Sequence, residues 1–193
     1  PLKNVQAGTL RLEPLTTVSP WSAQQEPGKI GIPAGGTISV DLALQTLLVY
    51  SANDMAYVLA EAGGGTVHNF VQDMNATALK LGLAATHYVN PNGLFDPRQL
   101  TSARDIGVLA AVVSSEFPEY RHYFSQAYVP IGKRKLLKHN SLNREMPDAD
   151  GMKTGFVCTS GYNLVTSARR NGRRILAGQL GTAIPANCVA HTT

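Results

Sequence analysis

Apolar residues recur at helical spacing through the middle of the chain, between polar residues that are typical of helix ends. The apolar positions of Val40–Leu48 follow Ser39, a residue type that caps helix N-termini, and Asp41 stands in the first turn. The run Tyr50-Ser-Ala-Asn-Asp54 interrupts the pattern, which resumes to about Ala62. We therefore expect two consecutive helices with a polar break between them.

Two more helices are expected further along. Thr66 precedes a stretch whose apolar positions repeat every three or four residues and that ends near Gly82. Another begins at Ser102, where the spacing to Asp105 resembles a capping box, and ends before Pro118. Residues 39–115 are therefore predicted to be mainly helical.

The last third of the chain reads as strands. Three apolar runs, at about 151–158, 161–169 and 173–180, are separated by short polar breaks. Asn171-Gly172 lies between the last two, and Asn-Gly between apolar runs is the strongest short signal for a hairpin. These runs predict three consecutive antiparallel strands.

The first 39 residues are rich in proline and glycine, and we expect short extended pieces and loops there rather than a packed helix. Asn90-Pro-Asn-Gly93 predicts a tight turn. Helices followed by an antiparallel meander make an α+β pattern. The length of 193 residues suits one domain, with a helical part at about 39–122 and a sheet part at about 123–193.

Composition excludes several classes of protein. Hydrophobic residues make up 44% of the chain and charged residues 16%, so a sizeable core can form. The net charge of +4 is mild, and without a stripe of basic and aromatic residues we expect no nucleic-acid partner. The densest basic run, Lys133–Lys135 with Lys138 and His139, reads as a solvated hairpin or loop edge. No run of 18 apolar residues occurs, so we expect no transmembrane segment in this chain.

Metal and cofactor chemistry have little support. The five histidines show no H-E-x-x-H or H-x-H pattern, and we expect neither a metal nor a cofactor. Cys158 and Cys188 have neither metal-ligand nor C-x-x-C spacing, and we expect free thiols rather than a disulfide. No G-x-S-x-G elbow is present, which argues against an α/β-hydrolase.

Two short polar patterns remain. Ser51-Ala-Asn53 breaks the helical pair, where short polar side chains usually cap a helix. Lys153-Thr-Gly155 opens a strand in an otherwise uncharged run. A buried ammonium group is costly unless something pairs with it, so Lys153 either reaches water or awaits an anion that arrives with a ligand.

Together, the two patterns resemble motifs of the penicillin-recognising serine enzymes, which combine S-x-x-K, S-x-N and K-T-G. The chain is similar over nearly its whole length to the D-alanyl-D-alanine carboxypeptidases of peptidase family S11. The resemblance is carried by four blocks in the family's order: "SANDMAYVLAE", "FVQDMNATALKLGLAATHYVNPNGL", "TSARDIGVLA" and "DGMKTGFVCTSGYNLVTSARRNGRRILAGQLG". It implies a β-lactamase/transpeptidase-like fold, an antiparallel sheet with a helical subdomain.

The resemblance also implies roles for the residues of the second pattern. The ammonium of Lys153 would meet the free carboxylate of a terminal D-alanine, and Thr154 would add a hydroxyl donor. Gly155 would leave room for the peptide against the strand edge. The backbone N–H of Phe156 would form half of an oxyanion hole.

The first pattern would supply the remaining groups. Ser51 would relay a proton toward the leaving amine, and Asn53 would hold the substrate's amide. The implied chemistry is acyl transfer through a serine ester, on peptidoglycan peptides ending in D-Ala-D-Ala and with β-lactams as inhibitors. The implied location is the periplasm or extracytoplasmic cell envelope.

One family motif is missing, because no serine in the sequence has a lysine three residues on. Lys3 could be the lysine of such a motif, but the segment after it resembles the one that follows the S-x-x-K helix. We therefore expect that helix, and the strands before it, upstream of Pro1. Two alternatives stay open: a non-catalytic module that binds muropeptides or β-lactams, and a β-lactamase-like hydrolase.

Overall fold

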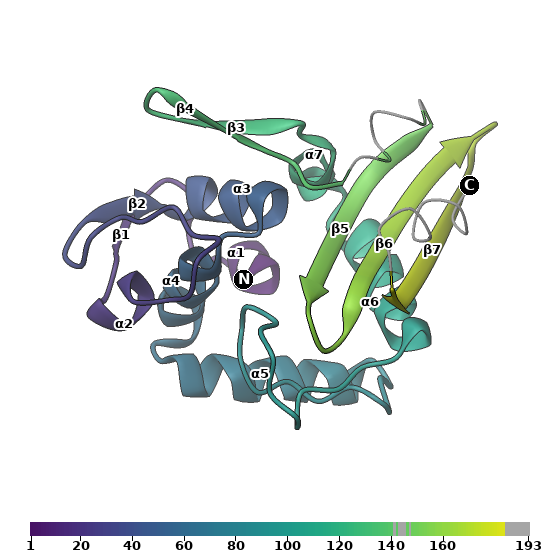
Figure 1. Ribbon diagram of the computed structural model, residues 1–193, viewed down its shortest axis with the longest axis horizontal. Helices are drawn as coiled ribbons and strands as arrows, with labels where there is room; N and C mark the ends of the chain where they lie inside the picture. Colours follow the sequence, from purple (N-terminus) through teal and green to yellow (C-terminus); the bar gives the residue numbers. More distant parts are fainter. Residues whose placement is uncertain (141, 143–145, 147, 184–193) are drawn as a thin grey trace.

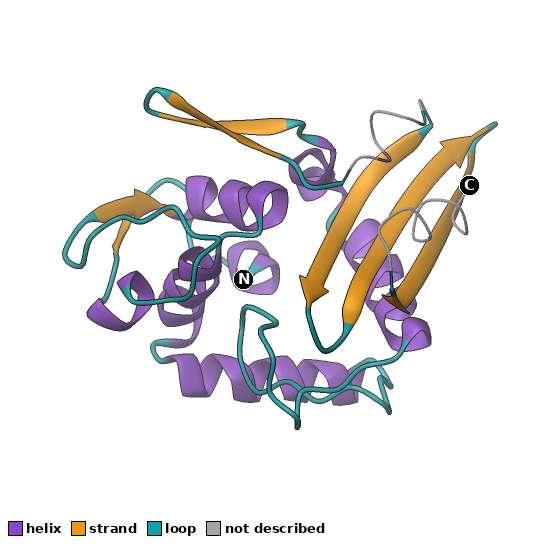
Figure 2. Cartoon of the chain, viewed as in Figure 1, coloured by secondary structure: helices purple, strands orange, loops and turns teal. Residues whose placement is uncertain are grey.

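The structure is a computed structural model that describes residues 1–140, 142, 146 and 148–183. Its helices are α1 (Leu2–Gln6), α2 (Pro20–Ala23), α3 (Val40–Tyr50), α4 (Asn53–Gly64), α5 (Val67–Lys80), α6 (Ala103–Glu116) and α7 (Arg121–Ser125), with a 3-10 turn, η1 (Pro118–Tyr120). Its strands are β1 (Leu15–Thr17), β2 (Thr37–Ser39), β3 (Tyr128–Ile131), β4 (Arg134–Leu137), β5 (Ala149–Val157), β6 (Gly161–Arg170) and β7 (Arg173–Thr182). Figures 1 and 2 show a helical half beside a three-stranded sheet, an α+β arrangement as predicted.

The helical half has the capped helices that the sequence predicts. The hydroxyls of Ser39, Thr66 and Ser102 each accept a hydrogen bond from the backbone N–H three residues on. The largest core cluster lies between α3 and α4. Its buried members include Leu44 of α3 and Met55 of α4. No helix among the described residues is long and apolar enough to cross a membrane.

The sheet has the strand order β5-β6-β7, and all its pairings are antiparallel. The β6–β7 turn is the predicted one, since Asn171 and Gly172 both have positive φ, 51° and 76°, as a type I′ turn requires. α6 packs against one face of the sheet through a cluster that contains Ala110, Met152 and Val165. β5 is the strand nearest the helical half (Figure 1).

The expectation for the first 39 residues is partly wrong. They contain the hairpin of β1 and β2, but also the short helices α1 and α2. Leu2 and Val5 of α1 pack on the main core cluster, and α1 lies in the middle of the molecule (Figure 1). A helix of five residues is too short to show a periodic pattern in the sequence.

Two finer predictions also need correction. The carboxylate of Asp105 does not close a capping box but accepts hydrogen bonds from the Ala85 N–H at 2.9 Å and the Thr86 hydroxyl at 2.8 Å. The basic run forms the predicted hairpin of β3 and β4, but Lys138 just beyond it is buried rather than solvated. Cys158 is an exposed free cysteine, and Cys188 lies outside the described residues.

Candidate functional site

The two polar patterns meet where the helical half faces the sheet. Lys153, on β5, donates hydrogen bonds from Nζ to the Ser51 hydroxyl and, at 2.6 Å, to the carbonyl of Thr154. Ser51 and Lys153 are 102 residues apart in the sequence. The fold therefore brings a hydroxyl and an ammonium group into direct contact, which is the geometry that proton transfer needs.

Ser51 has an unusual backbone conformation. It ends α3 with φ 64° and ψ 40°, in the left-handed region, and Asn171 is the only other non-glycine residue with positive φ among the described residues. This conformation costs about 1–2 kcal/mol. The backbone of Ser51 is the C-cap of α3, as the capping interpretation has it, and its N–H donates to the Leu47 carbonyl. The side chain of Ser51 does not cap α4, whose N-cap is Ala52. Its hydroxyl is instead held at Lys153, and a strained residue held this way indicates a functional constraint.

Asn53 and Asp54 organise the loop beside Ser51. The side-chain nitrogen of Asn53 donates to the Pro27 carbonyl at 2.9 Å, while its side-chain oxygen accepts no hydrogen bond from the described residues. The fully buried carboxylate of Asp54 accepts from the backbone N–H groups of Ile30 and Gly31. Asn53 therefore keeps one free acceptor, while Asp54 is a structural anchor that the sequence did not single out.

Lys153 has no carboxylate partner among the described residues, where every ion pair involves an arginine. Burial and, as the smaller cause, repulsion from Lys138 together lower the pKa of Lys153 to about 8. Burial likewise lowers the pKa of Lys138 to about 8, and its Nζ donates to the Phe124 carbonyl. The ammonium groups of Lys153 and Lys138 therefore repel each other, with no carboxylate of the described residues paired to either, and that of Lys153 donates a hydrogen bond to the Ser51 hydroxyl.

The residues after Lys153 follow the open edge of β5. Thr154 pairs with Leu164 of β6, and its hydroxyl makes no hydrogen bond with the described residues. A Cβ added to Gly155 would meet nothing closer than the Asn163 Cβ at 4.0 Å, so the space beside this residue is open. Phe156 is 53% exposed. Its ring centroid lies 4.4 Å from that of Tyr162.

All six predicted site residues line one cleft of about 1280 Å³. His139 and Asn140 also line it, as does the loop from Tyr88 to Thr101. His139 Nε2 lies 3.1 Å from the carbonyl of Tyr50, so this ring supports the residue before Ser51. No sequence pattern pointed to His139, because it stands in a basic run that is typical of a solvent-exposed segment.

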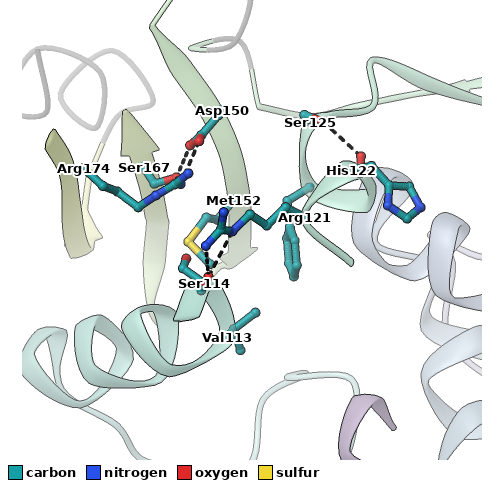
Figure 3. Close-up of a pocket in the computed structure, with 10 residues that line it drawn as sticks. Val113, Ser114, Arg121, His122, Ser125, Asp150, Met152, Ser167 and Arg174 are labelled. Atoms are coloured by element: carbon teal, nitrogen blue, oxygen red, sulfur yellow. Dashed lines mark hydrogen bonds and ion pairs between the residues drawn. The ribbon is translucent and has the colours of Figure 1, made fainter. Parts of the chain in front are cut away.

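A second cavity, of about 90 Å³, lies behind β5, between α6, α7 and the sheet (Figure 3). Asp150 pairs with Arg174 at 2.7 Å, and the Ser167 hydroxyl hydrogen-bonds to both side chains. Arg121 points to the carbonyl of Ser114 on α6 (Figure 3). Asp150, Ser167 and Arg174 thus pair with one another and link β5, β6 and β7. We therefore interpret this cavity as part of the structural framework and not as a binding site.

No cluster of three or more His, Cys, Asp or Glu suited to a metal occurs within the described part of the chain. The end of the cleft where Ser51 meets Lys153 presents hydroxyl, amide and ammonium groups. These groups suit recognition of a carboxylate and an amide, together with proton transfer at a hydroxyl.

Comparisons with known proteins identify the family to which the chain is similar. The family model described as D-alanyl-D-alanine carboxypeptidase, peptidase family S11, matches residues 3–183. The chain is 34% identical over 158 residues to the D-alanyl-D-alanine carboxypeptidase DacA of Haemophilus influenzae, an alignment that covers 81% of this chain and 40% of DacA. The chain thus spans less than half the length of this relative.

Solved structures share the fold. Penicillin binding protein 5 from Haemophilus influenzae superposes with a TM-score of 0.94 at 28% identity, covering 98% of this chain and 57% of that one. The D-alanyl-D-alanine carboxypeptidase DacD from Francisella tularensis gives a TM-score of 0.92 at 27% identity, with coverages of 98% and 58%. The arrangement of the cleft thus occurs on a fold shared with penicillin-binding proteins.

Proposed function

Because the chain belongs to the D-alanyl-D-alanine carboxypeptidases of peptidase family S11, we propose that its cleft binds peptidoglycan peptides ending in D-Ala-D-Ala and takes part in removing the last residue. β-Lactams would occupy the same place as inhibitors. Since such peptides belong to the cell wall, the protein would work outside the cytoplasmic membrane.

The contact between Ser51 and Lys153, with no carboxylate partner for Lys153 in the part of the chain that the structure describes, is the observation that carries this proposal. A desolvated ammonium without a counter-ion is unfavourable in the free protein and becomes favourable when an anion binds. The free carboxylate of a terminal D-alanine is such an anion, and the Thr154 hydroxyl offers it a second donor. Gly155 leaves the strand edge open for the peptide backbone.

The reaction would be acyl transfer to a serine. The nucleophilic hydroxyl attacks the carbonyl carbon between the two D-alanines, and the N–H of Phe156 donates to the developing oxyanion. The C–N bond breaks, and the leaving amine takes a proton relayed through Ser51 and Lys153. Water then hydrolyses the ester and releases the shortened peptide. Asn53 would accept a hydrogen bond from an amide N–H of the bound peptide.

A second function, binding without turnover, would apply if no S-x-x-K motif completes the cleft; none occurs within these 193 residues. Without a nucleophile the same cleft would bind muropeptides or β-lactams and release them unchanged. Lys153 would bind the ligand carboxylate in both functions. Only the enzyme would form a covalent serine ester with the peptide or the β-lactam, so detection of this ester distinguishes the two.

The binding role can be tested with two peptides that differ only at the C-terminus, an acyl-D-Ala-D-Ala acid and its amide. Lys153→Ala removes one charge-assisted hydrogen bond, on the order of 1.5–3 kcal/mol. Affinity for the acid should therefore fall roughly 10- to 150-fold, and affinity for the amide much less. Lys135→Ala, on the exposed hairpin, is the matched control and should change neither. Equal losses for acid and amide would show that Lys153 does not recognise the carboxylate.

A further inference from the structure

Four arginines stand beside the turn of the β6–β7 hairpin. Arg169 and Arg170 end β6, and Arg173 and Arg174 begin β7; together they are the arginine tip. Arg169 pairs across the strands with Arg174, and Arg170 pairs with Arg173. Like charges directly opposite each other destabilise an antiparallel pair, and neither strand has an acidic residue to separate them. Because this arrangement opposes folding, it indicates a role outside the fold.

Neighbouring carboxylates neutralise only part of the arginine tip. Asp148 and Asp150 each form an ion pair of 2.7 Å with one of the four arginines. Arg169 and Arg173 are exposed, and neither forms an ion pair with a carboxylate of the described residues. Arg170 is paired with Asp148, but its side chain is still 74% exposed. Three guanidinium groups at the tip can therefore reach a ligand in solvent.

The arginine tip lies away from the cleft. The turn between β5 and β6 lines the cleft, whereas the four arginines do not. In Figure 1 the β6–β7 turn is at the upper end of the sheet and the β5–β6 turn is at the lower end. The positive φ angles of Asn171 and Gly172 suit a tight two-residue turn, so the arginines are held on a short, well-defined ribbon. A ligand at the tip could bind while the cleft is occupied.

The residue type at the tip favours phosphate as the ligand group. A guanidinium group can donate two parallel hydrogen bonds to the oxygens of one phosphate, and arginine is the residue best suited to this geometry. Arginine occupies all four positions of the tip, and no lysine does. The β3–β4 hairpin is also basic, but there the Arg134 side chain donates to the Ile30 carbonyl at 3.1 Å and Lys135 Nζ lies 4.8 Å from the centroid of the Tyr128 ring. The arginine tip is therefore the more available of the two.

The shape of the tip favours a flexible polymer over a membrane or a nucleic acid. Successive residues of a strand point to opposite faces, so the arginines stand on both faces of the ribbon, where a flexible chain can reach them. Surfaces that dock on membranes combine basic residues with apolar ones that enter the bilayer. Here the exposed Ile175 lies behind Arg173, farther from the turn. The segment 169–175 contains no aromatic residue on which a base could stack.

We propose that the arginine tip binds a base-free phosphodiester polymer, a flexible chain with one negative charge on each repeat. The polymer would neutralise the like-charged pairs that the fold leaves uncompensated. This site is separate from the cleft and does not depend on the proposed function.

Binding can be measured with a fluorescein-labelled dodecamer of propanediol phosphodiester, by fluorescence anisotropy with the full chain. The dodecamer should bind saturably, and its affinity should fall as salt rises, because bound phosphates release their counterions. Arg169→Gln combined with Arg173→Gln should weaken binding roughly 5- to 30-fold, since an exposed ion pair contributes up to about fivefold. The same change should flatten the plot of log affinity against log salt by about 1.4, or about 0.7 for each lost phosphate contact.

The matched control removes the same charge from the other basic hairpin. Lys133→Gln combined with Lys135→Gln should leave both the affinity and its salt dependence close to those of the native protein. Equal losses in the two double variants would show that only the overall charge matters and would overturn the proposal. The arginine variant should be at least as stable as the native protein in urea, because it removes one member of each like-charged pair. A loss of stability would instead assign these arginines to the fold.

Three other anions distinguish the class of ligand. A thymidylate dodecamer adds bases to the same number of phosphates and should bind no more tightly than the base-free dodecamer. A glutamate dodecamer of similar charge should bind more weakly, and so should phosphatidylglycerol vesicles at the same concentration of exposed phosphate. Tighter binding of thymidylate would assign the tip to nucleic acid, and preference for the vesicles would assign it to a membrane. Equal binding of glutamate would show that phosphate is not recognised. Each of these results would overturn the proposal.

Discussion

The start and the middle of β5 carry opposite charges, one paired within the fold and one without a carboxylate partner among the described residues. Near its start, Asp150 pairs with Arg174 at 2.7 Å and accepts a hydrogen bond from Ser167, so its charge is neutralised within the scaffold. At the middle of the strand, half-buried Lys153 lies close enough to a second lysine to be repelled by it and has no carboxylate partner among the described residues. A charge that is paired in the free protein stabilises the fold, whereas an unpaired buried charge is costly to the fold and available to a ligand. The start of the strand thus serves the fold, while its middle is available for recognition of a ligand.

Two glycines of β5 also differ between the start of the strand and its later part. Their replacement should give the largest changes in the free energy of unfolding. Gly151 has φ +127°, and a Cβ there would lie 2.5 Å from the Phe124 carbonyl oxygen. Gly151→Ala combines backbone strain with overpacking, and we expect a loss of about 2–5 kcal/mol in the free energy of unfolding. Urea denaturation measures this loss.

Gly155→Ala is the matched change four residues on, where the added Cβ meets open space. It should leave the free energy of unfolding within about 0.5 kcal/mol and weaken binding of an acyl-D-Ala-D-Ala peptide. If Gly155→Ala proved as destabilising as Gly151→Ala, the distinction between the start of the strand and the part from Lys153 onward would be lost.

Breaking the paired charge should come next in size. Asp150→Ala leaves the guanidinium of Arg174, whose side chain is 23% exposed, without its carboxylate. We expect a loss of about 1–3 kcal/mol in the free energy of unfolding, measured in urea. The fraction that stays folded should keep its affinity for the D-Ala-D-Ala peptide, because the ion pair lies outside the cleft. A selective loss of affinity at unchanged stability would assign Asp150 to recognition instead.

Removing the unpaired charge should have the opposite sign. The pKa of Lys153 is about 8 in the folded protein against an ordinary value of 10.5, so the fold disfavours the ammonium form. Lys153→Met should therefore raise the free energy of unfolding at pH 7 by on the order of 2 kcal/mol.

The pH dependence of this gain follows from the same pKa shift. Between pH 8 and 10.5 the unfolded chain binds more protons at Lys153 than the folded chain does, so the stability of the native protein rises with pH in this window. The advantage of Lys153→Met should shrink over the same window. A Lys153→Met protein that is less stable than the native one at pH 7 would indicate that the ammonium is structurally paired.

The smallest expected effect is at Lys138. Its charge lowers the pKa of Lys153, after the larger effect of burial. Lys138→Met should raise the pKa of Lys153, and binding of the acid peptide should then persist to higher pH. Lys138→Arg keeps the charge and should keep the native profile. Identical profiles for Lys138→Met and the native protein would show that the second lysine does not act on the first.

Much of the fold could be predicted because local signals decide it. Ser39, Thr66 and Ser102 cap helices through their own side chains, and Asn171 with Gly172 sets a turn by backbone preference. These effects need only a few neighbouring residues. The same reasoning failed at α1, whose five residues are helical because Leu2 and Val5 pack on a distant core.

The sequence identified which residues form the site, but it could not predict which groups surround them or how deeply they are buried. The motifs at Ser51 and Lys153 pointed to the polar groups, because Lys153 is the only charged residue between Gly151 and Leu164. The burial of Lys138 and the support of Tyr50 by His139 depend on how the β3–β4 hairpin lies against α3, which no local pattern contains. The left-handed turn at Ser51 is likewise a tertiary result, since serine has no preference for it.

The claim that Lys153 holds its charge for a ligand carboxylate can be measured at the lysine itself. In protein labelled with ¹³C-lysine, the Lys153 Cε resonance, assigned through Lys153→Arg, reports the pKa of the side chain by NMR titration. We predict a pKa near 8 in the free protein, a rise when an acyl-D-Ala-D-Ala acid is bound, and no rise with the amide. A pKa of Lys153 that is the same with and without the acid at saturation would contradict the account.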